Sequence, residues 1–295
     1  MFAKGHGTEN DFVLLVDRDD REPLTDDQVR WICDRRAGIG ADGVLRAVAA
    51  RHLPEWSGDP DVWFMDYRNA DGSIAEMCGN GVRVFVRHLI DEGLAEGPMV
   101  PVGTRAGLRT TEVLPDGRVR VAMGPARVST DDVRVLTAGR QTFDAVPVDV
   151  GNPHAVSFCP DPTRIDLRTA PTWRPAEAFP YGVNAEFVGA LGPRHLTMRV
   201  YERGSGETRS CGTGTVAAAA AWHARRGHEA LAVSEGRPSD STVRYRVDVP
   251  GGTVEVELGE QTFLTGPAVV IARGELMIPD SPSVPDSPSL PLAVG

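Results

Sequence analysis

Lysine is almost absent from this sequence: of the 31 basic residues only Lys4 is a lysine, and the rest are arginines. An enzyme that holds pyridoxal phosphate as a Schiff base needs a lysine at its active site. Such an enzyme would have to rely on Lys4 alone. We therefore do not expect a pyridoxal-phosphate enzyme.

Long apolar runs and an excess of positive charge are also missing. No run approaches the roughly 18 apolar residues of a membrane helix, and the opening "MFAKGHGTENDF" lacks the apolar core of a signal peptide. The formal net charge is −10, whereas binding to nucleic acid phosphates requires clustered Lys and Arg. We expect a cytoplasmic protein without a nucleic acid or membrane partner.

Cysteines are few and widely spaced. The four are Cys33, Cys78, Cys159 and Cys211. They do not resemble a secreted disulfide framework, and without a C-x-x-C pair they do not predict a zinc site, even with His154 added. The remaining histidines have no spacing typical of ligands. We expect reduced thiols and no metal.

Residues 38–43 spell G-x-G-x-x-G. The segment before them, "TDDQVRWICDRR", predicts a helix with Thr25 as N-cap, and the segment after them predicts a strand. A dinucleotide-binding fingerprint needs the reverse order, strand before helix. We interpret 38–43 as a glycine-rich turn.

The chain of 295 residues, 41% hydrophobic and 24% charged, is long enough for two domains of moderate size. Strand patterns surround one helix after Gly81, which stops at Gly93, and again surround a helix that ends at Gly227. The hairpin turns "PDG" and "PGG" separate further strands. The Pro/Ser-rich end of the chain is expected to be disordered.

The two helices share the way they start. Residues 76–85 read "EMCGNGVRVF" and residues 209–218 read "RSCGTGTVAA", so a Cys-Gly-x-Gly turn precedes both helices. This repetition predicts two similar halves. We expect an N-terminal half at 1–127 with a return strand at 268–277, a C-terminal half at 128–267, and a tail at 278–295.

A helix N-terminus provides unpaired N–H groups and a partial positive charge, which lower the pKa of a cysteine there. The N–H groups of Gly79, Asn80, Gly212 and Thr213 suit a carboxylate. If both helix starts meet, one thiolate removes the α-proton of the bound acid and the opposite thiol returns a proton to the other face. The pattern predicts racemisation.

Other interpretations of the cysteines remain open. Cys78 and Cys211 could be small buried fillers, since free cysteine is among the most buried residue types. Two nearby thiols could also oxidise, as a route of inactivation. Cys33 and Cys159 lack the motif, and we expect them to be structural.

Five motifs in order make the chain resemble the diaminopimelate epimerase family. They are "KGHGTENDF", "RNADGSIAEMCGNGVRVF", "DVGNPHAV", "VNAEFV" and "ERGSGETRSCGTGTVAAA", and the resemblance extends to about residue 277. It implies an α/β fold of the α+β type, with two pseudo-symmetric domains that are each a curved mixed sheet or open barrel around a central helix. It also implies a cofactor-independent homodimeric isomerase that converts LL- into meso-diaminopimelate for lysine and peptidoglycan synthesis.

The resemblance also implies roles for individual residues. Cys78 and Cys211 match the two acid/base thiols, and His154 and Glu202 match residues that support the reacting centre. The residues that match substrate contacts are Asn10, Asn69, Gly79, Asn80, Asn152, Asn184, Glu202, Arg203, Gly212 and Thr213. Taken alone, the asparagines could be turn formers, and Glu202 with Arg203 could be a solvated ion pair.

This chain departs from the family pattern in places. Some members have Gln at the position of Gly43, so one contact is in doubt, and Ala185 stands where a larger apolar residue is frequent. Rival functions are a racemase of another amino acid, such as histidine or proline, and a non-catalytic binding or thiol-redox protein. "CGNG" differs from the proline racemase pattern, which more often has His after the first Cys-Gly.

Overall fold

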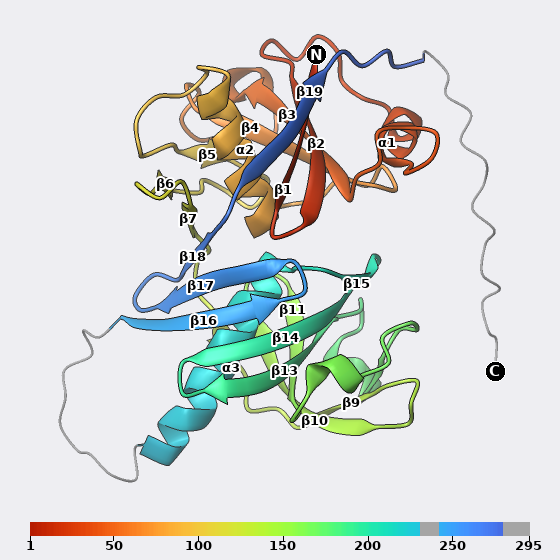
Figure 1. Cartoon of the computed structure of the whole chain (residues 1–295), viewed down its shortest axis with the longest axis vertical. Helices are drawn as coiled ribbons and strands as arrows, with labels where there is room; N and C mark the ends of the chain where they lie inside the picture. Colours follow the sequence, from red (N-terminus) through yellow and green to blue (C-terminus); the bar gives the residue numbers. More distant parts are fainter. Residues whose placement is uncertain (231–241, 280–295) are drawn as a thin grey trace.

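The computed structural model describes residues 1–230 and 242–279. Figure 1 shows two mixed β-sheets, one above the other, each packed around one long helix. The predicted fold of two similar α/β halves is confirmed. Residues 280–295, most of the tail expected to be disordered, lie outside the described residues.

Counted over the described residues, the first sheet has six strands and the second has thirteen. In spatial order the first consists of β19 (Val269–Gly274), β1 (Phe2–Gly7), β2 (Asn10–Val16), β3 (Gly43–Ala49), β4 (Trp63–Asn69) and β5 (Val102–Gly103). The main path of the second consists of β12 (Thr172–Arg174), β9 (Val133–Leu136), β10 (Thr142–Asp149), β11 (Pro153–Phe158), β13 (Asn184–Gly192), β14 (His195–Glu202), β16 (Val243–Val249), β17 (Gly252–Leu258), β18 (Phe263–Gly266), β7 (Val119–Ala122) and β6 (Thr111–Val113). Two short strands pair beside this path, β15 (Gly206–Thr208) with β14 and β8 (Arg127–Val128) with β10.

The strand order repeats between the sheets. From β1 to β5, the successive pairings along the first sheet are antiparallel, parallel, antiparallel and parallel. The series β10, β11, β13, β14, β16 has the same four pairings. In each series the long helix precedes the last strand, so the duplicated sequence pattern corresponds to a duplicated topology.

In the described part of the chain, 1–230 and 242–279, three α-helices accompany the sheets: α1 (Asp26–Cys33), α2 (Gly79–Asp91) and α3 (Gly212–Ala230). The predicted N-cap of α1 is confirmed, because Thr25 and Gln28 form a reciprocal capping box. Gly93 adopts a φ of +67° just beyond α2, as a helix-ending glycine does. The predicted end of the last helix at Gly227 is wrong, since α3 continues to Ala230. The described residues also form short 3-10 helices, which are η1 (Ala50–His52), η2 (Pro162–Arg164) and η3 (Ala176–Ala178).

Most residues of α2 and the segment 216–221 of α3 are buried. In α2 the apolar residues and even Arg83 are buried, and α3 presents a buried run of small residues, 216–221, to its sheet. Alanine combines high helix propensity with a small side chain, so α3 packs closely. Each fully buried Val, Leu or Phe contributes about 1.5–3 kcal/mol through loss of apolar surface from water.

Two parts of the chain pair with strands that are distant in sequence. The return strand β19, blue in Figure 1, pairs antiparallel with the red strand β1. Strands β6 and β7 precede residue 127 in sequence but pair with the second sheet through β18. The proposed division at residue 127 remains a prediction.

The glycine-rich segment 38–43 is a turn between α1 and β3, as predicted. Gly40 has a φ of +77°, and a Cβ there would lie 2.9 Å from the Cα of Arg35. Only glycine fits both the backbone angle and the close approach.

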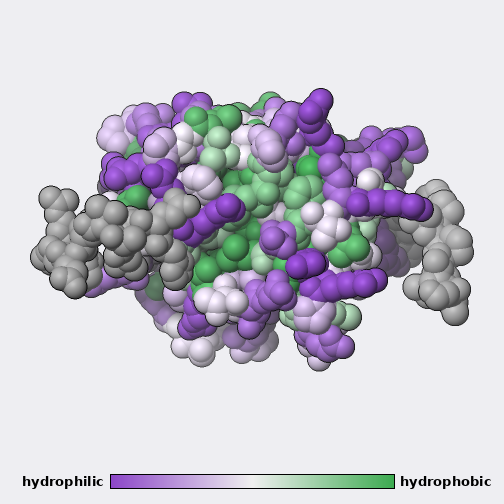
Figure 2. All heavy atoms as spheres, turned by 90° about the horizontal axis from the view of Figure 1, so that it is seen from below, coloured by the Kyte–Doolittle hydropathy of each residue, from purple (hydrophilic) through white to green (hydrophobic). Residues whose placement is uncertain are grey.

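Figure 2 shows the lower end of the molecule, where apolar side chains reach the surface between hydrophilic ones. This end lies away from the junction of the two sheets seen in Figure 1. Within residues 1–230 and 242–279, no helix has both the length and the hydropathy needed to cross a membrane.

Candidate active site

Cys78 and Cys211 occupy matching places at the starts of the two long helices. The Sγ of Cys78 accepts a hydrogen bond from the N–H of Gly81, and the Sγ of Cys211 accepts one from the N–H of Gly214, both at 3.4 Å. Each cysteine carbonyl also accepts the first helical hydrogen bond, at 2.9 Å in both helices. Both thiols are therefore N-cap groups, and the predicted helix starts are confirmed.

The two helix starts lie in direct contact. A Cβ added to Gly212 would lie 3.2 Å from the Cα of Gly79 and 3.3 Å from the N of Asn80. Neither glycine has room for a side chain, since a Cβ on Gly79 would approach Met123 to 2.9 Å. The first-turn N–H groups have no partner within their own helices, so both sets of donors meet at one place.

Asn80 bridges the two halves. Its Nδ2 donates to the carbonyl of Ser210 at 3.0 Å and to the Ser210 Oγ at 3.2 Å. Its Oδ1 accepts from the buried guanidinium of Arg83 at 2.8 Å, and Arg83 also donates to Thr8 at 3.0 Å. Burial lowers the pKa of Arg83 to about 10. This network holds the residue before Cys211 against the first turn of α2.

Cys78 is linked to the amino-terminal sheet through Asn10. The Sγ of Cys78 lies 3.5 Å from the Oδ1 of Asn10, whose Nδ2 donates to Asp42 at 2.8 Å. Burial, followed by the nearby charge of Asp11, raises the pKa of Asp42. Asn10 is thus a positioned side chain next to the thiol, whereas Asp42 is a contact that the sequence did not indicate.

Cys211 stands at the end of a chain of hydrogen bonds. The Nδ1 of His154 lies 2.6 Å from the Oε1 of Glu186, and its Nε2 lies 2.9 Å from the Oδ1 of Asn152. Asn152 donates to the Oγ1 of Thr213 at 3.4 Å, and that oxygen lies 3.5 Å from the Sγ of Cys211. The side chains of His154 and Glu186 are fully buried. This chain fixes the positions of Asn152 and Thr213 beside the thiol.

The expected lowering of the thiol pKa values is wrong for this state of the protein. Burial raises the pKa of Cys78 to about 11, although the N–H groups of Gly81 and Asn80 act in the opposite direction. Burial also raises the pKa of Cys211 well above its usual value, and the charge of Glu202 adds to this. Loss of water around a thiolate outweighs the helix N-terminus here.

Glu202 and Arg203 are not a solvated ion pair. Glu202 accepts a hydrogen bond from Thr208, and burial raises its pKa to about 7, against the lowering effect of hydrogen bonds from Thr208 and Cys211. Arg203 is exposed, and its backbone N–H donates to the Oδ1 of Asn184 at 3.0 Å. Glu202 therefore lies at the Cys211 thiol, while Arg203 reaches outward.

Asn69 is the predicted residue that the structure does not connect to the others. Its side-chain amide donates to the Oγ of Ser73 at 3.0 Å within its own turn, as a turn former does. Its backbone pairs with Gly43 at the end of β4, in the same sheet as Asn10.

The remaining cysteines pack in other places. Cys33 belongs to the apolar cluster around α1, and Cys159 belongs to a cluster in the second sheet. Burial raises the pKa of both thiols. Within the part of the chain that the structure describes, no three His, Cys, Asp or Glu side chains are grouped closely enough to hold a metal ion.

Sequence reasoning missed several residues at the site, among them Thr8, Asp42, Arg83, Glu186, Thr208 and Ser210. Thr8, Glu186 and Ser210 stand inside the motifs quoted above. Glu186 offered a signal, since it is an acidic residue inside the otherwise apolar strand segment 185–188. A carboxyl at a buried strand position requires a partner, and His154 is that partner.

Solved structures share this architecture at low sequence identity. A probable proline racemase from Agrobacterium radiobacter aligns with a TM-score of 0.67 and 17% identity, covering 94% of this chain and 93% of the other. A phenazine biosynthesis protein of the PhzF family from Bacillus anthracis aligns with a TM-score of 0.65 and 16% identity, covering 94% and 98%. These similarities establish the fold alone.

The sequence comparisons are more specific. The family model described as diaminopimelate epimerase matches residues 2–129 and 146–271. The diaminopimelate epimerase of Streptomyces coelicolor is 49% identical, covering 93% of this chain and 94% of that protein. The diaminopimelate epimerase of Corynebacterium glutamicum is 47% identical, covering 94% and 98%. Together with the paired thiols, these matches show that the chain belongs to the diaminopimelate epimerase family.

Proposed function

We propose that this protein converts LL-diaminopimelate into meso-diaminopimelate in lysine and peptidoglycan biosynthesis, by a two-base mechanism that uses Cys78 and Cys211. The observation that carries the proposal is the pair of N-cap thiols at two helix starts that touch each other. The names of the related proteins support the choice of diaminopimelate as the substrate.

In this mechanism the α-carboxylate binds the first-turn N–H groups, at Gly79 and Asn80 of α2 and at Gly212 and Thr213 of α3. One cysteine, as thiolate, removes the α-proton and becomes a thiol. The other cysteine, as thiol, gives its proton to the opposite face and becomes a thiolate. The N–H groups and helix dipoles stabilise the negative charge that develops on the carboxylate oxygens.

Burial raises the pKa of both thiols, so the base needs a further group that stabilises its thiolate form. A thiolate is unfavourable at a buried position, but an ammonium group bound beside it favours the charged form. The α-ammonium of an amino acid is such a group. We propose that substrate binding lowers the pKa of the thiol that acts as base, while burial keeps the other cysteine protonated as the acid.

The distal end of diaminopimelate is a second amino acid centre. We propose that the Arg203 guanidinium binds its carboxylate, since this exposed group is the cation among the candidate residues. Asparagine side chains provide further polar contacts to this end. The proposed residues are Asn10, Asn69, Asn152 and Asn184.

The test of the function is epimerisation of LL-diaminopimelate by reduced, cofactor-free protein in deuterated water. We expect meso-diaminopimelate with one solvent deuterium at the inverted α-carbon, because the proton that is removed differs from the one returned. Mass spectrometry and separation of the stereoisomers measure both. If no deuterium enters, diaminopimelate is not the substrate, and the same assay with histidine and proline tests the rival racemases.

The pKa of Glu202, about 7, predicts how activity depends on pH. Below this pH the carboxyl is neutral and attracts the substrate ammonium weakly, so kcat/KM should rise with pH up to about 7. Burial keeps both thiols of the free enzyme protonated in this range, so they do not titrate near pH 7. Measured kcat/KM profiles report the groups of the free enzyme that titrate.

Glu202→Gln removes the titrating carboxyl. We expect the variant to lose the rise of kcat/KM centred near pH 7. Glu207→Gln is the matched control, because Glu207 is an exposed carboxyl of the same hairpin, paired with Arg199. An unchanged lower limb in Glu202→Gln would assign that limb to another group.

We also propose that the protein acts in the cytoplasm as a homodimer, without a nucleic acid or membrane partner. The net charge of −10 supports the absence of nucleic acid binding. The family resemblance supports the homodimer.

A further inference from the structure

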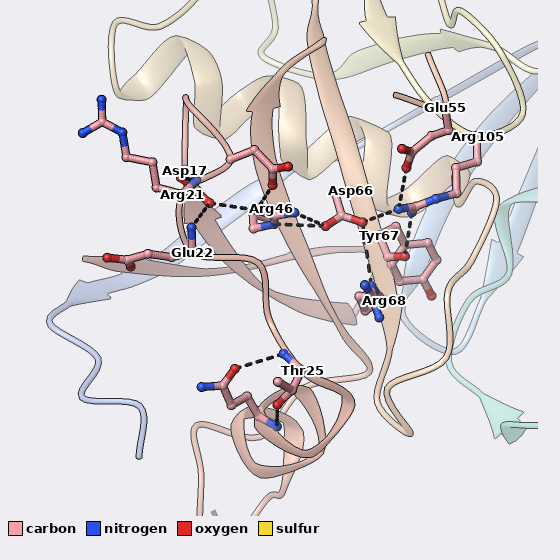
Figure 3. A network of polar contacts seen from close by, with 12 residues as sticks. Asp17, Arg21, Glu22, Thr25, Arg46, Glu55, Asp66, Tyr67, Arg68 and Arg105 are labelled. Atoms are coloured by element: carbon pink, nitrogen blue, oxygen red, sulfur yellow. Dashed lines mark hydrogen bonds and ion pairs between the residues drawn. The ribbon is translucent and has the colours of Figure 1, made fainter. Parts of the chain in front are cut away.

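Tyr67 lies on β4 and belongs to the apolar cluster that also contains the buried residues of α2. Its side chain is buried, and its ring stands edge-on to Phe12, with 5.9 Å between the centroids. The preceding residue of the strand, Asp66, points to the opposite face. Figure 3 shows that Asp66 joins Arg46 and Arg105 there in a network of ion pairs. The strand is therefore held firmly on one face while Tyr67 occupies the other.

The backbone of Tyr67 is also fixed. Its carbonyl accepts hydrogen bonds from the N–H of Ala75 at 3.1 Å and from Arg105 at 3.4 Å. The Ala75 contact ties β4 to the chain that leads into Cys78, and the Arg105 contact ties β4 to the chain that follows β5. The position of the tyrosine ring is thus determined by a buried neighbour and by two backbone contacts.

The ring extends over Gly43. A Cβ added to Gly43 would lie 2.5 Å from the carbonyl oxygen of Arg68 and 2.8 Å from the Cε2 of Tyr67, so the edge of the ring lies directly against Gly43. Gly43 directly follows Asp42, which holds Asn10, and Asn10 in turn contacts the Cys78 thiol. These contacts bring the phenol end of Tyr67 to the Cys78 side of the site.

Among residues 1–230 and 242–279 the hydroxyl of Tyr67 forms no hydrogen bond, and its oxygen keeps some accessible surface, since it is not one of the fully buried polar atoms without a partner. A buried tyrosine hydroxyl normally has a hydrogen-bond partner. Burial raises the pKa of Tyr67, and the negative charges of Cys78 and Glu202 raise it further. The ring contacts with Phe12 and Gly43, together with these charges, place the hydroxyl on the side of Tyr67 that lies toward the thiols.

The substrate group that suits this place follows from charge. The α-carboxylate is placed at the helix N-termini by the proposed function, and near Glu202 a second carboxylate would be repelled. The remaining polar group at the reacting centre is the ammonium. A phenol oxygen has lone pairs that accept hydrogen bonds from an ammonium.

We propose that the Tyr67 hydroxyl is a substrate-contacting group that, together with Glu202, binds the ammonium of the reacting amino acid centre. This role rests on the proposed epimerase function. It adds to that function a residue that selects for an amino group at the reacting carbon. Tyr67 takes no proton from carbon, so its contribution lies in binding and orientation.

The test compares Tyr67→Phe with wild type in the epimerisation of LL-diaminopimelate. Loss of a hydrogen bond to a charged group should raise KM roughly 10- to 100-fold, with kcat changed less than about threefold. Tyr245→Phe is the matched control, because Tyr245 is a tyrosine remote from the thiols whose hydroxyl pairs with His223. We expect its KM and kcat to equal those of wild type.

Pimelate, a dicarboxylate without amino groups, distinguishes the contacted group. Its inhibition constant should be the same for wild type and Tyr67→Phe, because it has no ammonium for the hydroxyl to bind. An equal weakening of pimelate, or a lowered melting temperature with equal losses for both ligands, would overturn the ammonium contact in favour of another contact or a structural role.

The outcomes separate the two proposals. If wild type converts LL-diaminopimelate and Tyr67→Phe has the same KM, the role of Tyr67 is refuted and the epimerase function stands. If wild type exchanges no α-proton of LL-diaminopimelate, the function fails and the role of Tyr67 fails with it.

Discussion

Cys78→Ala and Cys211→Ala should each lose epimerase activity by about a thousandfold or more, because a two-base reaction needs a proton donor and a proton acceptor on opposite faces. Neither thiol can replace the other, since each is held at its own helix start by an N–H hydrogen bond of 3.4 Å. The measurement is conversion of LL- to meso-diaminopimelate by each purified variant.

Serine variants keep this prediction separate from folding. Serine is a favourable N-cap residue, so Cys78→Ser and Cys211→Ser should retain the helix starts and the melting temperature while losing activity. Cys159→Ala is the control, because this thiol lies outside the site. Substantial activity in Cys78→Ser or Cys211→Ser would contradict the two-base mechanism.

Gly212→Ala should separate the helix starts. The added Cβ would lie 3.2 Å from the Cα of Gly79, which is closer than an ordinary contact. The Gly79 atom belongs to the backbone of α2, so it cannot move aside as the end of a flexible side chain would. We expect a loss of about 1–3 kcal/mol in the free energy of unfolding. We also expect a fall in kcat/KM of roughly a hundredfold, since the N–H groups that bind the carboxylate move apart. Denaturant unfolding and steady-state kinetics measure the two effects.

Gly227→Ala provides the matched control within the same helix. Among the described residues, a Cβ on Gly227 would meet no atom within 4 Å beyond its own stretch of helix, so alanine should stabilise α3 by up to about 1 kcal/mol and leave activity unchanged. If Gly212→Ala behaved like Gly227→Ala, the close contact between the helix starts would not matter for binding.

Features that depend on short stretches of chain were predictable. The capping box at Thr25, the glycine turn at 38–43 and the two helices after Cys-Gly-x-Gly all follow from residues within a few positions of one another. The prediction for Gly227 failed because a single glycine lowers helix propensity by only about 1 kcal/mol, which neighbouring residues offset.

The direction of the thiol pKa shifts could not be predicted from the neighbouring sequence. The helix N-terminus is a local feature and does lower the pKa of Cys78 through N–H groups. Burial depends on residues from both sheets and raises the pKa by more, so its sign could be known only from the folded structure. The same holds for Glu202, whose raised pKa also follows from burial.

By itself the sequence determined the family, the duplicated halves and the two thiols, because these are encoded in motifs that fold locally. Only the tertiary structure decided which side chains surround them. Glu186 meets His154, Asp42 meets Asn10, and Tyr67 covers Gly43 through strand pairing and sheet packing. Such contacts join residues that are distant in sequence, and their partners are selected by the packing of the whole chain.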